Sequence, residues 1–242
     1  MADPVLNVEQ LVVEFQGSRA VDAIDLKVSA GTVYALLGGN GAGKTTTLNC
    51  LLGFVRPTSG RVSVGGIALS ETPSAARRLL AYLPENVALY PYMTGEENLR
   101  YFCEIADLKM DRARLRQHLT EAGLASAAHS VKLGKYSKGM RQKVGLAIAH
   151  ARRAQAMLLD EPTSGLDPGA ANELSRRLRQ SANSGMAILM ATHDLFNARQ
   201  VADRIGIMQR GRLVAEFDAS SVTHEELEHT YLTHAGTARE RP

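Results

Sequence analysis

The sequence lacks tryptophan, has only two cysteines and contains no apolar run long enough to cross a membrane. Residues 1–4 do not show the basic-then-apolar pattern of a secretory leader. Cys50 and Cys103 lie far apart in apolar helical contexts, which favours buried free thiols over a disulfide. We therefore expect a cytoplasmic protein with no membrane span of its own.

Two classes of binding site have little support in the composition. His224, His229 and His234 recur every five residues, so no two of them share a helical face as paired metal ligands would. The formal net charge is +3, and the basic residues occur in short groups without interleaved aromatic side chains. We expect neither a metal site built from protein side chains alone nor nucleic acid as a partner.

A glycine-rich loop is the most informative feature that the sequence does contain. Residues 38–45 match the spacing G-x-x-x-x-G-K-[ST] and directly follow the apolar run Val33–Leu37. Glycines let backbone N–H groups turn inward around an anion, and the next helix directs its positive end to the same place. The pattern predicts a nucleoside-triphosphate site formed by Gly38, Gly39, Asn40, Gly41, Ala42, Gly43, Lys44, Thr45 and Thr46.

Three side chains of this phosphate loop (residues 38–46) have separate expected roles. Lys44 is expected to reach the β- and γ-phosphates. The hydroxyl of Thr45 is the expected Mg²⁺ ligand, and Thr46 is expected to donate on the side of the α-phosphate. A glycine turn without a ligand is the alternative, which the strand-loop-helix context disfavours.

Two acidic residues, Asp160 and Glu161, follow the apolar run 157–159. At the carboxyl end of a buried strand, where ligands of α/β proteins bind, an uncompensated pair of carboxylates would be costly. We expect Asp160 to hold Mg²⁺ directly or through water, and Glu161 to orient and polarise the water that attacks the γ-phosphate. A surface acid pair is the structural alternative.

His193 follows a third apolar run, 188–191, again at the carboxyl end of an expected strand. A lone histidine often only fills space. Because Lys44 and Glu161 are expected at the same edge of the sheet, we favour a contact with the γ-phosphate that reports whether this phosphate is present.

The periodicity of apolar residues predicts an α/β fold. Residues 5–30 and 60–83 alternate apolar and polar side chains, which predicts half-exposed antiparallel strands. The three apolar runs described above predict buried strands of a parallel sheet. Residues 94–154 have a helical pattern and form an expected inserted lobe, whereas residues 220–242 end in a charged stretch that we expect to fray.

Seven features occur in a characteristic order along the chain. They are Phe15, the phosphate loop, Tyr82-Leu83-Pro84-Glu85, the signature-like segment Tyr136-Ser137-Lys138-Gly139-Met140, Leu159-Asp160-Glu161-Pro162, Ser164-Gly165-Leu166-Asp167 and Thr192-His193-Asp194. With these features, the sequence from about residue 5 to residue 217 resembles the nucleotide-binding subunit of an ABC transporter.

The resemblance implies a fold, ligands and partners. The implied fold is a P-loop NTPase with a RecA-like parallel-sheet core, an antiparallel β subdomain and an α-helical subdomain inserted at about residues 86–155. Residues 1–220 form a single ATPase domain, and residues 221–242 form a short tail. Two copies enclose ATP and Mg²⁺ as a homodimer, which an integral membrane permease holds at the cytoplasmic face of the cell membrane.

Several residue roles are also implied by the resemblance. Ser137, Lys138 and Gly139 meet the γ-phosphate of ATP bound by the partner copy, and a helix that opens there would direct its positive end toward this phosphate. Phe15 stacks on adenine, with a core phenylalanine as the alternative. Asp167 crosses the dimer interface, with a turn aspartate before a proline as the alternative.

The chain departs from the usual family sequence in two of these features. Glu85 stands where glutamine is usual, at the hinge that senses Mg²⁺ and touches the membrane partner; a carboxylate remains a Mg²⁺ ligand but adds negative charge beside the phosphates. Lys138 falls within the segment that replaces the usual Leu-Ser-Gly-Gly-Gln and adds a cation. Both variants resemble exporter-type ATPases of the ABC-2 branch, and residues 82–87 and 136–142 are also similar to the copper-site maturation ATPase of nitrous oxide reductase systems.

The function favoured by the sequence is ATP hydrolysis that drives a separate permease, with export as the implied direction. The first alternative is an ABC ATPase that serves as a mechanical module in a cofactor-assembly or DNA-repair complex. Repair relatives need a long coiled coil before the signature-like segment, and residues 54–136 show no sustained heptads. The second alternative, a metabolic kinase or GTPase, leaves the signature-like segment and His193 without a role.

Overall fold

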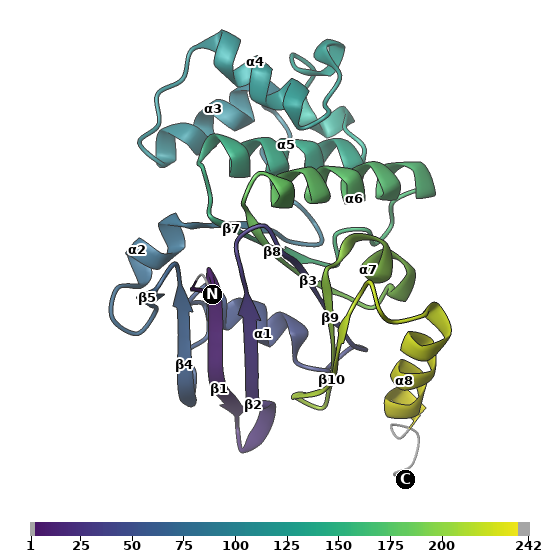
Figure 1. Ribbon diagram of the computed structural model, residues 1–242. Helices are drawn as coiled ribbons and strands as arrows, with labels where there is room; N and C mark the ends of the chain where they lie inside the picture. The colour runs from purple at the N-terminus through teal and green to yellow at the C-terminus, as the bar shows by residue number, and fades with distance from the viewer. Residues whose placement is uncertain (1–2, 237–242) are drawn as a thin grey trace.

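The computed structural model describes residues 3–236, which fold around two β-sheets (Figure 1). One sheet has six strands in the order β10-β9-β3-β8-β7-β6, and the other has four in the order β2-β1-β4-β5. The strands are β1 (Leu6–Phe15), β2 (Ser18–Val28), β3 (Val33–Leu37), β4 (Ser59–Val64), β5 (Ile67–Ala68), β6 (Leu80–Leu83), β7 (Ala156–Asp160), β8 (Ala187–Thr192), β9 (Arg204–Gln209) and β10 (Arg212–Asp218). The α-helices are α1 (Lys44–Leu51), α2 (Pro73–Arg78), α3 (Gly95–Ile105), α4 (Arg112–Glu121), α5 (Lys138–Ala151), α6 (Pro168–Asn183), α7 (Leu195–Val201) and α8 (His224–Gly236).

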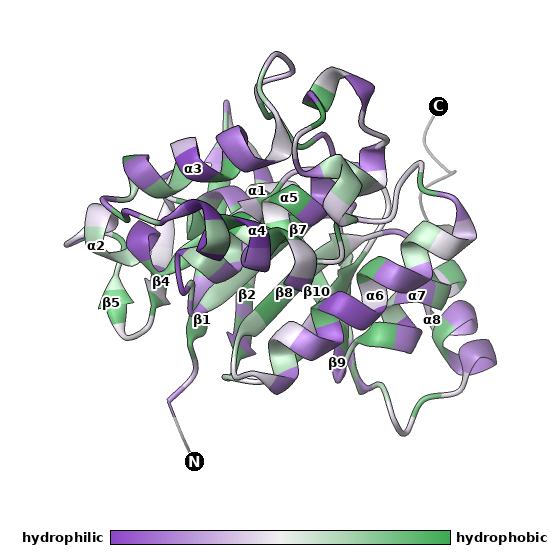
Figure 2. Cartoon of the chain, turned by 90° about the horizontal axis from the view of Figure 1, so that it is seen from above, coloured by the Kyte–Doolittle hydropathy of each residue, from purple (hydrophilic) through white to green (hydrophobic). Residues whose placement is uncertain are grey.

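The larger sheet forms the buried centre of the molecule. β9, β3, β8, β7 and β6 are joined by parallel pairing, and every residue of β3 and β8 is buried. Continuous burial is typical of parallel strands, because helices cover both faces of such a sheet. In Figure 2, β8 is largely hydrophobic whereas α6 beside it carries hydrophilic stretches. The prediction of three buried parallel strands is confirmed, and their carboxyl ends lie at one edge of the sheet.

The smaller sheet is antiparallel, with β1 pairing with β2 and β4, and β4 with β5. Apolar side chains alternate along β1 and β2, as predicted for strands with one face on a core. The expectation that residues 79–83 continue this antiparallel pattern is wrong. β6 pairs in parallel with β7 at the edge of the larger sheet, with Leu83 opposite Leu159. Four residues are too few for periodicity to separate the two kinds of strand.

α3, α4 and α5 form the helical lobe (residues 95–151), at the top of Figure 1. α3 begins with a capping box in which Thr94 accepts from the backbone N–H of Glu97 and the Glu97 carboxylate accepts from Thr94 N–H. Leu99 of α3 and Leu115 of α4 are fully buried and belong to the same apolar cluster as α5. The expected helices of the inserted lobe are therefore confirmed, whereas the subdomain boundaries remain a prediction.

The described part of the C-terminal segment is ordered by packing. α8 follows a capping box in which Thr223 and Glu226 exchange backbone and side-chain hydrogen bonds of 2.8 and 3.1 Å. Val222 and Leu227 are buried in the apolar core. Two apolar anchors and a cap therefore hold this segment, whereas the charged stretch that we expect to fray begins only at residues 236–237. Residues 237–242 lie outside the described residues.

Cys50 and Cys103 are both free and buried, which confirms the expectation of thiols rather than a disulfide. Burial raises the pKa of the Cys50 thiol to about 11 and also raises that of Cys103, so both stay protonated near neutral pH. Across residues 3–236, none of the helices combines the length and apolar character needed for a membrane span.

Candidate nucleotide site

The phosphate loop connects β3 to α1, and two of its glycines are required by close packing. A Cβ at Gly38 would lie 2.5 Å from the backbone oxygen of Met208. Gly43, the N-cap of α1, has φ +105, and a Cβ there would lie 2.5 Å from the backbone oxygen of Ala20. A side chain at either position would force the backbone to move, so the loop owes its tight shape to glycine.

Lys44 is nearly buried beneath this loop. Its Nζ donates to the backbone oxygens of Gly38 at 2.6 Å and Gly39 at 3.2 Å. The same Nζ lies 3.6 Å from Oε1 of Glu161. The ammonium is thus held between the loop backbone and an acid from another strand.

A C-terminal hairpin supports the phosphate loop, a contact that the sequence did not reveal. Gly211, in the turn between β9 and β10, donates its N–H to the backbone oxygen of Ala42 at 2.9 Å. Gly211 has φ +81, and a Cβ there would lie 3.0 Å from the backbone oxygen of Ala20. The residues of a turn carry no information in the sequence about a partner as distant as Ala42.

Asp160 lies at the end of β7, opposite the start of α1. The hydroxyl of Thr45 donates to Oδ2 of Asp160 at 3.0 Å. Burial raises the pKa of Asp160, and the nearby Glu161 and Glu85 carboxylates raise it further, against the opposing effects of Thr45 and Lys44. A half-buried carboxylate next to other acids is a place where a cation would relieve electrostatic cost.

Glu161 has an unusual backbone conformation for a residue with a side chain, with φ +46. Its N–H donates to the backbone oxygen of Ala191 at 2.9 Å, which holds this conformation against the end of β8. Oε2 lies 2.8 Å from Nδ1 of His193, while Oε1 faces Lys44. Strain of this kind is concentrated at functional sites, and here it directs the carboxylate between a lysine and a histidine.

His193 lies at the carboxyl end of β8 with an exposed side chain. Its Nδ1 contacts Glu161, which leaves Nε2 as the second hydrogen-bonding atom of the ring. The sequence placed His193 and Glu161 at the same edge of the sheet, and the structure brings them into direct contact. Their pairing, however, was not predicted.

The signature-like segment begins α5. Ser137 is the N-cap, and its hydroxyl accepts from the N–H of Met140 at 3.3 Å. The nearest atom to a Cβ at Gly139 would be the Ala170 methyl at 3.5 Å, so no close packing requires a glycine there. The expectation that Ser137 and Gly139 open a helix is confirmed.

The buried side chain of Gln142 also ties this helix to the core, because its Nε2 donates to the backbone oxygen of Pro162, directly after the two acids. The sequence analysis did not identify Gln142. A polar residue inside an amphipathic helix gives no sign of the loop that it reaches.

Two further residues of the sequence analysis lie apart from this cluster. Phe15 ends β1 and is 49% exposed, which does not fit the alternative of a core phenylalanine. Oδ1 of Asp167 accepts from the N–H of Ala170 at 2.9 Å and caps α6. The turn role considered for Asp167 is therefore present in the structure.

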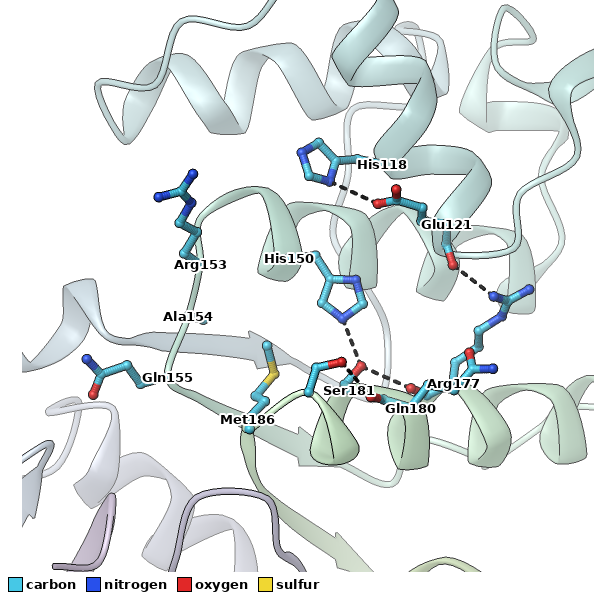
Figure 3. Close-up of a pocket in the computed structure, with 12 residues that line it drawn as sticks. His118, Glu121, His150, Arg153, Ala154, Gln155, Arg177, Gln180, Ser181 and Met186 are labelled. Carbon is cyan, nitrogen blue, oxygen red and sulfur yellow. Dashed lines mark hydrogen bonds and ion pairs between the residues drawn. The ribbon is translucent and has the colours of Figure 1, made fainter.

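A cavity of about 570 Å³ lies away from the phosphate loop, between the helical lobe and α6 (Figure 3). His118, His150, Arg153 and Arg177 line it. Arg177 donates to the backbone oxygen of Glu121 at 2.8 Å and lies 3.8 Å from Glu173, and the ring of His150 contacts the Ser181 hydroxyl at 2.8 Å. These contacts join α4 and α5 to α6, which gives Arg177 and His150 a structural role.

Comparisons with known proteins agree with this geometry. A family model described as ABC transporter matches residues 21–164. An uncharacterized ABC transporter ATP-binding protein, YdbJ of Bacillus subtilis, is 36% identical over 217 residues, covering 89% of this chain and 70% of the relative. The daunorubicin resistance ATP-binding protein DrrA3 of Streptomyces coeruleorubidus is 35% identical over 227 residues, covering 93% and 72%.

A solved ATP-binding subunit of an ABC transporter superposes with a TM-score of 0.83 at 31% identity, covering 96% of this chain and 99% of that chain. The likeness to copper-site maturation ATPases remains a prediction. The family match spans more than half of the sequence and includes the phosphate loop and both strand-end acids. The chain therefore belongs to the ABC transporter family, among its ATP-binding, ATP-hydrolysing subunits.

Proposed function

We propose that this subunit hydrolyses ATP to drive export through a separate membrane permease. The observation that carries the proposal is the contact chain from Lys44 through Glu161 to His193, which joins three strand ends at one edge of the sheet. Several relatives are named as antibiotic resistance proteins, which favours export over import. The permease would select the transported substrate.

The proposed roles at the phosphates follow from position. Gly38, Gly39, Asn40, Gly41, Ala42, Gly43, Lys44, Thr45 and Thr46 surround the triphosphate, with Lys44 on the β- and γ-phosphates. Glu161 orients the attacking water because its carboxylate is fixed beside Lys44 and His193. His193 contacts the γ-phosphate through the ring nitrogen that Glu161 does not occupy.

Thr45, Asp160 and Glu85 would hold Mg²⁺. The Thr45 hydroxyl already contacts Asp160, and Glu85 lies within electrostatic reach of Asp160. These oxygens suit a hard cation, and Mg²⁺ commonly combines one or two carboxylates with substrate phosphates and water. Within residues 3–236, no three His, Cys, Asp or Glu side chains gather into a metal site, so phosphates would complete this one. When bound, the ion would neutralise charge on the phosphates.

A second copy of the chain would complete each site. Ser137, Lys138 and Gly139 lie at the amino end of α5, where backbone N–H groups and the helix dipole favour an anion. We propose that they meet the γ-phosphate held by the partner copy, while the exposed ring of Phe15 stacks on adenine. The permease would place the homodimer at the cytoplasmic face of the membrane.

Detergent-solubilised membranes provide a test of this proposal. The tagged chain should recover an integral membrane protein in a fixed ratio, and the purified chain should dimerise only with ATP. Recovery of the chain from the soluble fraction alone, in an assembly or repair complex, would instead support the mechanical-module alternative. A Lys44→Ala control should lose ATP-dependent dimerisation without losing its fold, because the Lys44 ammonium bonds to the loop backbone and pairs with Glu161.

A further inference from the structure

Two of the residues that depart from the usual family sequence, Glu85 and Lys138, face each other in the structure. Nζ of Lys138 lies 3.8 Å from Oε1 of Glu85. The same Oε1 accepts a hydrogen bond of 2.9 Å from the hydroxyl of Ser164. Glu85 follows β6, Ser164 follows β7, and Lys138 is the first residue of α5, so one carboxylate connects the helical lobe to two loops of the core.

The Glu85 carboxylate lies near another acid, Asp160. Glu85 is close enough to Asp160 to raise its pKa, so Lys138 offsets part of the negative charge at the edge of the sheet. The ammonium also lies over the loop after β7, because a Cβ at Gly165 would be 3.8 Å from Nζ. Within residues 3–236, Lys138 forms its ion pair with Glu85.

We propose that Glu85 holds Lys138 as an intramolecular latch in the nucleotide-free chain, and that Lys138 must leave this carboxylate before it can bind a phosphate on the partner copy. The inference rests on the proposed function, which gives each member of the pair a competing ligand. For the ammonium, that ligand is a more highly charged phosphate. For the carboxylate, it is a divalent cation.

The exposure of the pair makes the latch weak enough to open. The side chain of Glu85 is 48% exposed and that of Lys138 is 26% exposed. Ion pairs exposed to solvent to this extent change the equilibrium between the paired and unpaired states by a factor of about 1.4 to 5. A phosphate and a divalent cation that each bind one partner would overcome a bias of this size.

A second ion pair of the same helix provides a matched control. Lys143 of α5 lies 2.7 Å from Glu173 of α6, and this pair also joins the helical lobe to the core. Glu173 is also paired with Arg177, at 3.8 Å, so this cluster of charges is separate from the phosphate loop and the strand-end acids. Loss of this pair should loosen the same helix without releasing Lys138.

The first measurement uses the full chain without nucleotide. Unfolding constants are compared for the unchanged chain, Glu85→Gln, Lys138→Met and the double variant. We expect the unfolding constant of the double variant to differ by about 1.4- to 5-fold from the value that adding the two single effects would give. The reversed pair, Glu85→Lys with Lys138→Glu, should recover most of this coupling. Additive effects within about 1.3-fold would overturn the latch.

The second measurement is dimerisation with a non-hydrolysable ATP analogue and Mg²⁺, followed by sedimentation. Glu85→Gln frees Lys138 yet keeps an amide oxygen for the metal, so it should dimerise at about 2- to 5-fold lower protein concentration. Lys138→Met should need a higher concentration, and Lys143→Met should match the unchanged chain. Weaker or unchanged dimerisation of Glu85→Gln would overturn the latch. Failure of the unchanged chain to dimerise would count against the proposed function, while the nucleotide-free comparison would still decide the latch.

Discussion

Replacing Glu161 by glutamine should separate ATP binding from ATP hydrolysis. Glutamine keeps the shape of the side chain but removes the charge that faces Nζ of Lys44 at 3.6 Å and Nδ1 of His193 at 2.8 Å. The attacking water then loses its orienting carboxylate. Loss of a positioned base typically lowers the rate by about 10²- to 10⁴-fold, so phosphate release should fall below about 1% of the original rate.

The same substitution should preserve or strengthen ATP binding. Lys44 loses a competing carboxylate, and Asp160 loses one of the charges that raise its pKa. Removing a unit charge at about 4 Å changes the interaction by about 1 kcal/mol in high dielectric, so the affinity should stay equal or increase up to about fivefold.

Titration with a fluorescent ATP analogue and steady-state phosphate release measure the two effects. Glu173→Gln is the control, because Glu173 pairs with Lys143 outside the site. Turnover of Glu161→Gln above about one tenth of the original rate would refute the assigned role, and so would loss of ATP binding in a folded protein.

Three further outcomes are expected. The His193→Ala variant should bind ATP within a few-fold of the original affinity. Its rate of phosphate release should fall about 10- to 100-fold, because the γ-phosphate and Glu161 both lose their contact with the imidazole. Gly38→Ala should lower the midpoint of thermal unfolding, whereas Gly39→Ala should not, because a Cβ meets the Met208 backbone oxygen at Gly38 and nothing within 4 Å at Gly39. Burial lowers the pKa of His150, and the nearby His118 and Arg177 lower it further, whereas Glu121 opposes this shift. The imidazole of His150 therefore binds a proton more readily in the unfolded chain than in the folded chain. The free energy of unfolding should therefore fall as the pH drops below about 6.5, and His150→Gln should weaken this dependence in denaturation experiments.

The sequence predicted the elements whose signals are local. The phosphate loop, the three apolar strands and the helices of the lobe each carry their own pattern of glycine or apolar residues, and each was found where expected. The placement of β6 was predicted wrongly and the docking of α8 was not predicted, because both depend on partners distant in sequence. α8 is anchored by Leu227, with Tyr231 packed against the same core, and so few apolar residues in a polar stretch do not distinguish a docked helix from a solvated tail.

The individual residues of the site were likewise easier to predict than their contacts. Strand-end acids and a strand-end histidine were expected at one edge because the carboxyl ends of parallel strands meet there. Gln142, Gly211 and the Glu85–Lys138 pair gave no comparable signal, since each contact joins segments that lie far apart in the sequence. These contacts determine how the edge is supported, and only the folded chain reveals them.

The order of strands in the larger sheet also explains why nucleotide and metal should bind together. β3, β8, β7 and β6 are consecutive neighbours, so their carboxyl ends present the phosphate loop, His193, the pair Asp160 and Glu161, and Glu85 in one row. Among the described residues, three carboxylates then lie along this edge, where Lys44 faces Glu161 and Lys138 faces Glu85. A triphosphate entering alone would meet net repulsion, which a divalent cation between Asp160 and the phosphates would convert into attraction. Because Lys138 occupies Glu85 in the nucleotide-free chain, the acidic end of this row is partly neutralised until that cation arrives.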